Sequence, residues 1–303
     1  MTEDLRNLHM VVLMGGPGSE RDVSLRSGAA VAAALRQGGY RVSALEIHGD
    51  DFVLPGDTGL CVNMIHGTFG EDGRLQEILD TRGIPYTGEG ARGSRLAFDK
   101  KESKRRFDEA GVPNARWEMI AAGELPRLPL PLVIKAPREG SSVGVHIVRS
   151  AQELDAALKD CASIDREILV EEFVAGRELT VGVVGDRALA VVEIRPHDGF
   201  YDYAHKYTKG ASDYFCPAPL DEETAARIRQ TALEAHRALG LEVYSRVDIL
   251  LRADGSLCVL ETNTIPGMTE TSLLPKAAAA VGMTFLGLCE EIARLSLHRF
   301  SKQ

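Results

Sequence analysis

Continuous hydrophobic runs alternate with amphipathic stretches along the first ninety or so residues. HMVVLMGG (9–16) is an apolar run ending in two glycines, which is typical of a buried strand followed by a turn. Residues 22–39 are rich in alanine and stop at Gly38-Gly39, as a helix does. The same two patterns recur further on, as strands at 41–47 and 60–65 and a helix at 73–83. Strands that alternate with helices predict a parallel, doubly wound sheet.

The pattern changes in the middle of the chain, where strands are expected in adjacent pairs. Residues 131–148 contain two short β-branched runs around a Gly/Ser loop, which predicts a hairpin closed by a flexible flap. SAQELDAALKDCA (150–162) predicts a helix that starts with a capping box of Ser150 and Glu153. The other elements expected here are a helix at about 99–110 and a strand at 166–174.

From about residue 178 onward the pattern predicts antiparallel structure. A hairpin is expected to turn at Gly185-Asp186, and a loop rich in Tyr, Lys and His follows it. A helix (221–239), a second hairpin (243–261) and one C-terminal helix complete the chain. We therefore expect three domains, with boundaries at 1–93, 94–177 and 178–303.

Composition narrows the class of protein. The 303 residues include 44% hydrophobic and 26% charged side chains, as in a soluble globular protein. The net charge of -9 argues against general nucleic-acid binding. No apolar stretch reaches the length of a membrane span, and the N-terminus lacks a signal-peptide pattern. Five scattered cysteines without a CxxC pair favour reduced thiols in the cytoplasm. The basic run KKESKRR (100–106) is expected to be a solvated helix face.

The second hairpin carries a candidate metal site. A turn centred on Asp254-Gly255 pairs Asp248 with Glu261, and Asn263 lies two residues further on the same face. Opposed side chains have Cβ atoms about 4.5–5.5 Å apart, and like charges at that distance are destabilising. The three oxygen ligands therefore predict a cation such as Mg²⁺, bound together with substrate phosphates. In the alternative, a register shifted by one residue would turn one carboxylate to solvent.

Two glycine-containing segments carry further candidate groups. GGPGSERDVS (15–24) is neither a Walker A loop nor a dinucleotide fingerprint. Glu20 within it could hold an ammonium or hydroxyl group, or it could simply be an acidic residue favoured by the helix dipole. Lys135 precedes a loop of small residues whose backbone N–H groups could bind phosphate, although an ordinary mobile loop remains the alternative.

Other polar residues are weaker candidates when each is taken alone. Glu171 could accept a hydrogen bond from an adenine amino group, and Glu178 could accept from ribose hydroxyls, although both are more often surface carboxylates. FYDYAHKYTKG (200–210) concentrates aromatic and cationic groups in a loop, which favours a lid over an anionic ligand. His66 follows a strand at an expected ligand-binding sheet edge, although a lone histidine is more often structural.

Taken together, these motifs resemble the D-alanine–D-alanine ligases of the ATP-grasp superfamily. The resemblance runs from GGPGSERDVS to LETNTIPGMTETSL and covers nearly the whole chain. It implies an α/β and α+β protein, in which a doubly wound parallel-sheet, substrate-binding domain precedes a two-module ATP-grasp fold. One departure is visible, because the family usually has proline directly after the lysine equivalent to Lys135, and alanine stands here.

The resemblance also implies roles for single residues. Nucleotide binding falls to Lys100, Lys135, Ser142, Glu171, Phe173, Val174, Glu178 and Lys206. Mg²⁺ or Mn²⁺ ligation falls to Asp248, Glu261 and Asn263, with Glu261 bridging two ions. The first D-alanine would be bound by Glu20, linked to Ser141 and Tyr207, and the oxyanion by Arg246 and the backbone of Gly267. His66, Ser272 and Leu273 complete the D-alanine site, the last two at the carboxylate of the second D-alanine.

The implied reaction joins two D-alanines with ATP, through an acylphosphate, for peptidoglycan precursor synthesis. Relatives that use D-lactate differ in the loop that holds Tyr207, so Tyr207 favours an amine as the acceptor. A ligase for D-lactate or other amino acids, and a non-catalytic nucleotide-binding relative, remain as alternatives. The resemblance also implies a cytoplasmic homodimer with no nucleic-acid or membrane partner.

Overall fold

β1 (His9–Gly15) is the central strand of the N-terminal sheet, in a computed structural model that describes residues 5–140, 144–197 and 211–302. A short 3₁₀ helix (Leu5–Asn7) precedes it. β1 pairs in parallel with β2 (Arg41–Ile47) and β3 (Thr58–Asn63). Its alternate side chains enter different cores, one shared with α1 (Arg21–Gln37) and α9 (Phe285–Phe300), the other with α2 (Arg74–Thr81). The parallel sheet covered on both faces confirms the predicted doubly wound arrangement.

Two helices lead from this sheet to a second, antiparallel one. α3 (Ala91–Phe98) ends at Asp99, whose side chain caps α4 (Lys100–Ala110) by accepting from the amides of Lys101 and Glu102. The four strands of the second sheet follow the order β4 (Trp117–Ala121), β7 (Glu167–Glu172), β5 (Leu132–Lys135) and β6 (Val145–Val148). α5 (Ala151–Ile164) buries Ala157 and Cys161 against this sheet.

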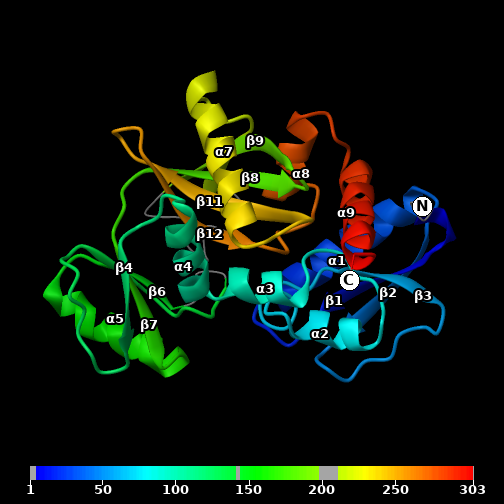
Figure 1. Cartoon of the computed structure of the whole chain (residues 1–303), viewed down its shortest axis with the longest axis horizontal. Coiled ribbons are helices and arrows are strands. Elements are labelled where there is room, and N and C mark those ends of the chain that lie inside the picture. Colours follow the sequence, from blue (N-terminus) through cyan, green and yellow to red (C-terminus); the bar gives the residue numbers. More distant parts are fainter. Residues whose placement is uncertain (1–4, 141–143, 198–210, 303) are drawn as a thin grey trace.

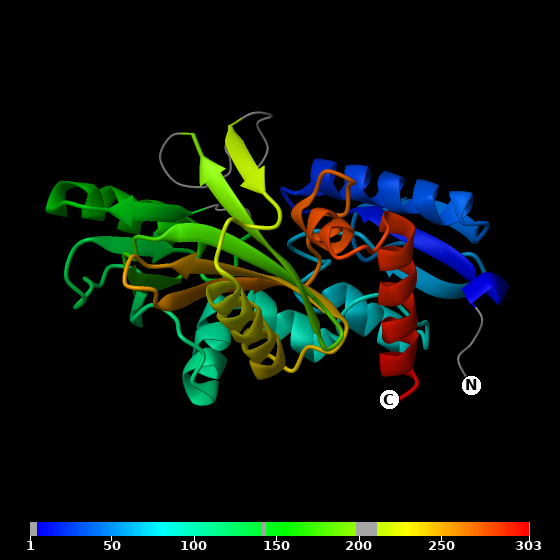
Figure 2. The same cartoon turned by 90° about the horizontal axis from the view of Figure 1, so that it is seen from above.

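The third sheet lies between the other two (Figure 1). Its strand order is β10 (Ser212–Phe215), β9 (Arg187–Pro196), β8 (Arg177–Val184), β11 (Tyr244–Leu251) and β12 (Leu257–Asn263). α7 (Glu222–Ala238) packs on one face with Ile228 and Ala232, and α8 (Leu273–Ala280) packs on the other with Leu274. α9 then returns to the N-terminal sheet (Figure 2), so the two ends of the sequence share one core.

Most expected elements are present, but four details differ. One C-terminal helix was expected, and the chain instead forms α8 and α9 with a bend of 102°. β4 was not predicted, and β10 lies within the expected loop. The capping box of α5 is incomplete, because the Ser150 side chain makes no cap bond while Glu153 accepts from the amide of Arg149. No single helix in the described ranges is long and apolar enough to span a membrane, although α8 and α9 together reach that length and composition.

Candidate active site

The opposed carboxylates of the second hairpin lie where the sequence predicted them. Asp248 on β11 pairs with Glu261 on β12, and Arg246 pairs with Asn263. The amide nitrogen of Asn263 lies 3.2 Å from Asp248 Oδ2, so the three candidate metal ligands converge on one face. Thr180, on the neighbouring strand β8, donates its hydroxyl to Asp248 Oδ1 at 2.6 Å. This dense bonding holds the nearly buried Asp248 carboxylate in one orientation.

Arg246 supplies the positive charge nearest to Asp248. Its Nε and Nη2 atoms donate to the two carboxylate oxygens at 2.9 and 2.7 Å, in the parallel geometry that guanidinium and carboxylate groups favour. Both side chains are largely buried. Within the described ranges, no group of three or more His, Cys, Asp or Glu side chains is arranged to hold an ion. A cation here would therefore depend on two carboxylates, an amide oxygen and oxygen atoms of the substrate.

A second charged cluster joins α4 to the antiparallel sheet. The Glu171 carboxylate, 3% exposed, lies 2.5 Å from the ammonium groups of both Lys104 and Lys135. Burial opposes ionisation of Glu171, but the two lysines outweigh it and lower its pKa to about 2. Burial likewise disfavours the charge on Lys135, yet Glu171 raises the pKa of Lys135. The cluster therefore keeps Lys135 charged inside a buried site.

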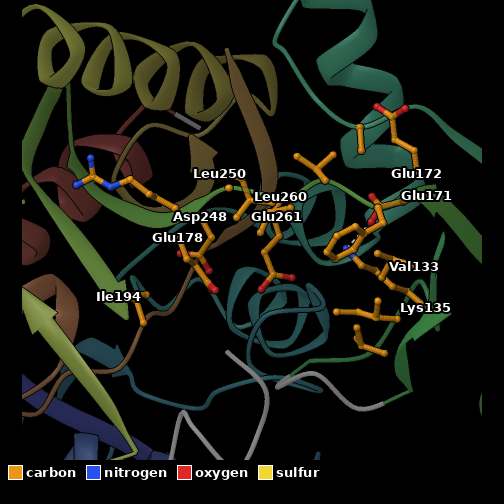
Figure 3. A pocket seen from close by; sticks show the side chains of 18 of the residues that line it. Val133, Lys135, Glu171, Glu172, Glu178, Ile194, Asp248, Leu250, Leu260 and Glu261 are labelled. Atoms are coloured by element: carbon orange, nitrogen blue, oxygen red, sulfur yellow. Dashed lines mark ion pairs between the residues drawn. The ribbon is translucent and has the colours of Figure 1, made fainter. Parts of the chain in front are cut away.

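This cluster and the hairpin carboxylates line one cavity of about 780 Å³. Figure 3 shows Glu178, Asp248 and Glu261 pointing into the cavity, with Lys135 and Glu171 on its other side. The remaining candidate nucleotide-binding residues among those described also line it, namely Lys100, Phe173 and Val174. Apolar side chains from four strands also line the cavity, namely Val133, Ile194, Leu250 and Leu260. A lining that combines charged and apolar side chains fits a ligand with a flat ring and an anionic tail.

An adjoining cavity of about 630 Å³ lies between the N-terminal sheet and the third sheet. The candidate D-alanine residues among those described all line it, namely Glu20, His66, Arg246, Gly267, Ser272 and Leu273. Asn263 lines it as well. Three residues, Lys100, Glu139 and Glu261, line both cavities, and the Lys100 ammonium lies 3.6 Å from Glu261 Oε2. Ligands in the two cavities would therefore meet beside Glu261.

Glu20 precedes α1 but does not cap it, since its side chain makes no cap hydrogen bond. Its carboxylate instead lies against the backbones of Gly67 and Gly140. A Cβ atom on Gly140 would come within 2.7 Å of Glu20 Oε2, and one on Gly67 would come closer still. Both positions therefore require glycine for the carboxylate to lie there. The alternative that Glu20 serves only the helix dipole is not favoured by this geometry.

Four candidate residues, Ser141, Ser142, Lys206 and Tyr207, lie outside the described residues, as does the expected lid at 200–210. Their roles remain predictions.

The protein resembles known ligases in sequence and in structure. The family model described as "D-ala D-ala ligase C-terminus" matches residues 107–294. A D-alanine–D-alanine ligase from Methylacidiphilum infernorum is 49% identical over 292 residues, which are 96% of each chain. The crystal structure of the D-alanine–D-alanine ligase from Bacillus anthracis superposes with a TM-score of 0.87 at 31% identity, covering 97% of this chain and 99% of that one. The structure of the same enzyme complexed with ATP superposes with a TM-score of 0.86 at 29% identity, covering 97% of this chain and 99% of that one.

The chain belongs to the D-alanine–D-alanine ligase family. Within this family's ATP-grasp fold, the one departure seen in the sequence has a local consequence. Ala136 follows Lys135, and its amide donates to the carbonyl of Gly144 at 3.2 Å. Proline at that position has no N–H and could not make this bond. The alanine therefore adds a hydrogen bond at the base of the β5–β6 loop.

The sequence did not predict that two charged residues, Lys104 and Glu71, are buried. The run at 100–106 was expected to be solvated, yet Lys104 is 2% exposed and also donates to Asn114 Oδ1 at 3.1 Å. Lys104 lies three residues before the buried Phe107, on the same face of α4, and this spacing was the signal that Lys104 is buried. Glu71 lines the second cavity, and burial together with Glu20 raises the pKa of Glu71 to about 7. Nothing in the local pattern distinguished Glu71 from a surface carboxylate.

Proposed function

We propose that the chain joins two D-alanines into D-alanyl-D-alanine with ATP, for peptidoglycan precursor synthesis. Family membership supports the reaction class. The observation that carries the proposal is the meeting of the two cavities at Lys100, Glu139 and Glu261. ATP in the larger cavity and D-alanine in the smaller one would bring the γ-phosphate and the substrate carboxylate together at that point.

The larger cavity is proposed as the ATP site. Its volume lies within the range of about 300–1,000 Å³ that is usual for sites of small ligands and cofactors. The adenine would contact Glu171 and the backbone of Phe173 and Val174, and the ribose would contact Glu178. A carboxylate has about four lone-pair directions, so Glu171 can accept from the adenine amino group while two lysines hold it. The phosphates would be bound by Lys100, Lys135, Ser142 and Lys206.

Asp248, Glu261 and Asn263 are proposed to hold Mg²⁺ or Mn²⁺, with Glu261 bridging two ions. The donor set fits, because two opposed carboxylates and a neighbouring amide offer only oxygen ligands to the ion. Thr180 and Arg246 hold Asp248 in place, which reduces the cost of ordering it on binding. When bound, the ions would neutralise charge on the β- and γ-phosphates during phosphoryl transfer.

The smaller cavity is proposed as the site of both D-alanines. Glu20, linked to Ser141 and Tyr207, would bind the ammonium group of the first D-alanine. Ser272 and Leu273, at the start of α8, would receive the carboxylate of the second, where the helix dipole favours an anion. Arg246 and the backbone N–H of Gly267 would bind the oxyanion, and His66 would support the site from the N-terminal side.

The reaction would proceed in two steps. A carboxylate oxygen of the first D-alanine attacks the γ-phosphorus, ADP leaves, and an acylphosphate forms. Lys100 and Lys135 stabilise the charge on the phosphate oxygens in this step. The amine of the second D-alanine, having lost a proton, then attacks the acyl carbon. Arg246 and the Gly267 N–H stabilise the tetrahedral oxyanion, and inorganic phosphate leaves as the peptide bond forms.

The wider setting follows from the same family relationship. We propose domains at 1–93, 94–177 and 178–303, the last two forming the ATP-grasp modules around the nucleotide. We also propose that the protein is a cytoplasmic homodimer.

The choice of acceptor has a direct test. With ATP, Mg²⁺, D-alanine and D-lactate supplied together at neutral pH, we expect the dipeptide as the main product. A dominant ester product would overturn the proposed amine acceptor and favour a D-alanine–D-lactate ligase. Phosphate release that D-alanine does not support, but another amino acid in a substrate panel does, would instead favour a ligase for other amino acids. No phosphate release would favour a non-catalytic relative.

A further inference from the structure

The backbone that follows β12 is held by side chains from the N-terminal third of the sequence. Both polar backbone groups of Ile265 are engaged. Its N–H donates to Glu71 Oε2 at 3.1 Å, and its carbonyl accepts from His66 Nδ1 at 2.6 Å. Three residues later, the N–H of Met268 donates to Ser27 Oγ at 3.2 Å. Residues 265–268 are thus fixed at both ends by three side chains distant in sequence.

The hydrogen bonds around His66 are consistent with one arrangement of protons. Ser27 Oγ accepts from the Met268 amide, so its own proton can be donated to His66 Nε2, 2.9 Å away. His66 then carries its proton on Nδ1 and donates it to the carbonyl of Ile265. Burial lowers the pKa of His66, which favours this neutral form. His66 therefore uses both ring nitrogens within the protein.

Glu71 completes the arrangement from its own loop. Its Oε1 accepts from the Gly67 amide at 2.8 Å, while its Oε2 accepts from Ile265 and lies 3.5 Å from the Thr264 hydroxyl. Ser27, His66 and Glu71 are 0%, 4% and 9% exposed, so water competes little for these bonds.

The segment that these residues hold runs between the candidate metal ligand Asn263 and Ser272. Gly267, which lines the smaller cavity, lies within it. A Cβ atom on Gly267 would lie 3.0 Å from Ser272 Oγ, so its backbone closely approaches the start of α8. A shift of Ile265 or Met268 would move the Gly267 N–H relative to a substrate in that cavity.

We propose that Ser27, His66 and Glu71 form a positioning clamp that holds the Gly267 N–H for the second chemical step, peptide-bond formation. This inference rests on the proposed ligase reaction. Donors to an oxyanion must be placed within tenths of an ångström, and a misplacement of about 1 Å can cost about 10²-fold in rate. The first step instead depends on Lys135, Asp248 and Glu261, which the clamp does not contact directly. Loss of the clamp should therefore slow the second step more than the first.

The test compares the two steps in Glu71→Gln and Ser27→Ala. Formation of the acylphosphate is followed by positional exchange of ¹⁸O between the bridging and non-bridging positions of ATP, and the second step by dipeptide formation. We expect the ratio of exchange to ligation to rise about tenfold, in keeping with a partly misplaced oxyanion donor. The KM for ATP should stay unchanged. Ser27→Ala removes one hydroxyl and carries the test if Glu71→Gln does not fold.

Glu89→Gln is the matched control. Glu89 is also buried, and it accepts from the backbone amides of Glu242, Val243 and Tyr244 at 2.8–3.0 Å, but it does not line either cavity. We expect its ratio of exchange to ligation to equal that of the unchanged protein. A fall of both rates in proportion in the clamp variants, or the same rise in ratio in Glu89→Gln, would overturn the clamp.

A second measurement separates failure of the clamp from failure of the proposed function. Hydrogen exchange at the amides of Ile265 and Met268 should be faster in the clamp variants and unchanged in Glu89→Gln. Unchanged exchange at both amides would show that the segment is not held as proposed. If the protein without substitutions forms no dipeptide, the ligase reaction is refuted, whatever the amide exchange shows.

Discussion

Asp248 faces Glu261 across the β11–β12 pair because Leu260 is an extra residue in β12. Near the turn, Leu251 pairs with Leu257, which is one residue away from the register of a two-residue turn at Asp254-Gly255. The bulge between Ile249 and Asp248 adds the missing residue and restores the pairing. It also places Leu260 beside Glu261 in the wall of the larger cavity. The hairpin thus supplies both apolar surface and a carboxylate at one point.

Leu260→Ala tests the apolar part of this arrangement. Removing three carbons from the cavity wall should raise the KM for ATP about tenfold, since each buried CH₂ is worth about 0.8 kcal/mol and Leu260 is only partly buried. The dependence on Mg²⁺ should not change. Leu257→Ala, on the same strand outside the cavity, is the control. An unchanged KM in Leu260→Ala would remove Leu260 from the ATP site.

Asp248→Asn tests the metal site. The change keeps the shape of the side chain but removes a charge, so we expect kcat to fall about 10²–10³-fold and the requirement for Mg²⁺ to rise. Asp254→Asn, in the exposed turn of the same hairpin, should behave as the unchanged protein. Titration of activity with Mg²⁺ makes the comparison. Near-normal turnover of Asp248→Asn with unchanged Mg²⁺ dependence would contradict the assignment.

Lys104→Met tests the buried cluster around Glu171. The change leaves the buried carboxylate with one of its two ammonium partners, so the free energy of unfolding should fall by about 3 kcal/mol. Lys101→Met removes the half-exposed ion pair with Glu167 from the same helix and should cost less than about 1 kcal/mol. Denaturant unfolding measures both changes. Equal losses of unfolding free energy would show that the buried ion pair of Lys104 stabilises the fold no more than the half-exposed pair of Lys101 does.

His236 gives the protein a pH-dependent stability. Burial, with a smaller contribution from Arg237, lowers the pKa of His236 to about 4 from its ordinary 6.5. The folded state therefore binds this proton less readily than the unfolded state does. The stability it contributes is present above pH 6.5 and is lost as pH falls toward 4, by about 3 kcal/mol in total.

In His236→Gln this part of the pH dependence should disappear, which unfolding measurements between pH 4 and 7 would reveal. The exposed His298, changed in the same way, provides the control. An identical pH slope in the His236 variant and the unchanged protein would refute the assignment.

The elements that could be predicted from the sequence are those whose causes are local. The apolar run of β1, the glycine stop after α1 and the turn at Gly185-Asp186 each have a short-range signal. The bend between α8 and α9 was missed, although Gly282 at φ +81° lies within it. The pairing of Asp248 with Glu261 was predicted correctly, but the register nearer the turn differs from the prediction by one residue, and the bulge in β12 cancels this difference.

The parts of the site that could not be predicted depend on contacts between distant residues. Glu71 meets Ile265 across 194 positions, and Lys104 meets Glu171 across the fold. A single sequence contains no signal for such pairs, because each residue alone is compatible with the surface. The family resemblance named residues that are proposed to bind ATP, the metal and D-alanine, and it did not name Lys104 or Glu71.

The most direct test of the central claim is the stoichiometry of the complete reaction. Purified protein with ATP, Mg²⁺ and D-alanine as the only amino acid should release ADP, phosphate and D-alanyl-D-alanine in equal amounts. Mass spectrometry identifies the dipeptide, and a coupled assay counts the phosphate. ATP hydrolysis without dipeptide, or no D-alanine-dependent phosphate release at all, would contradict the account.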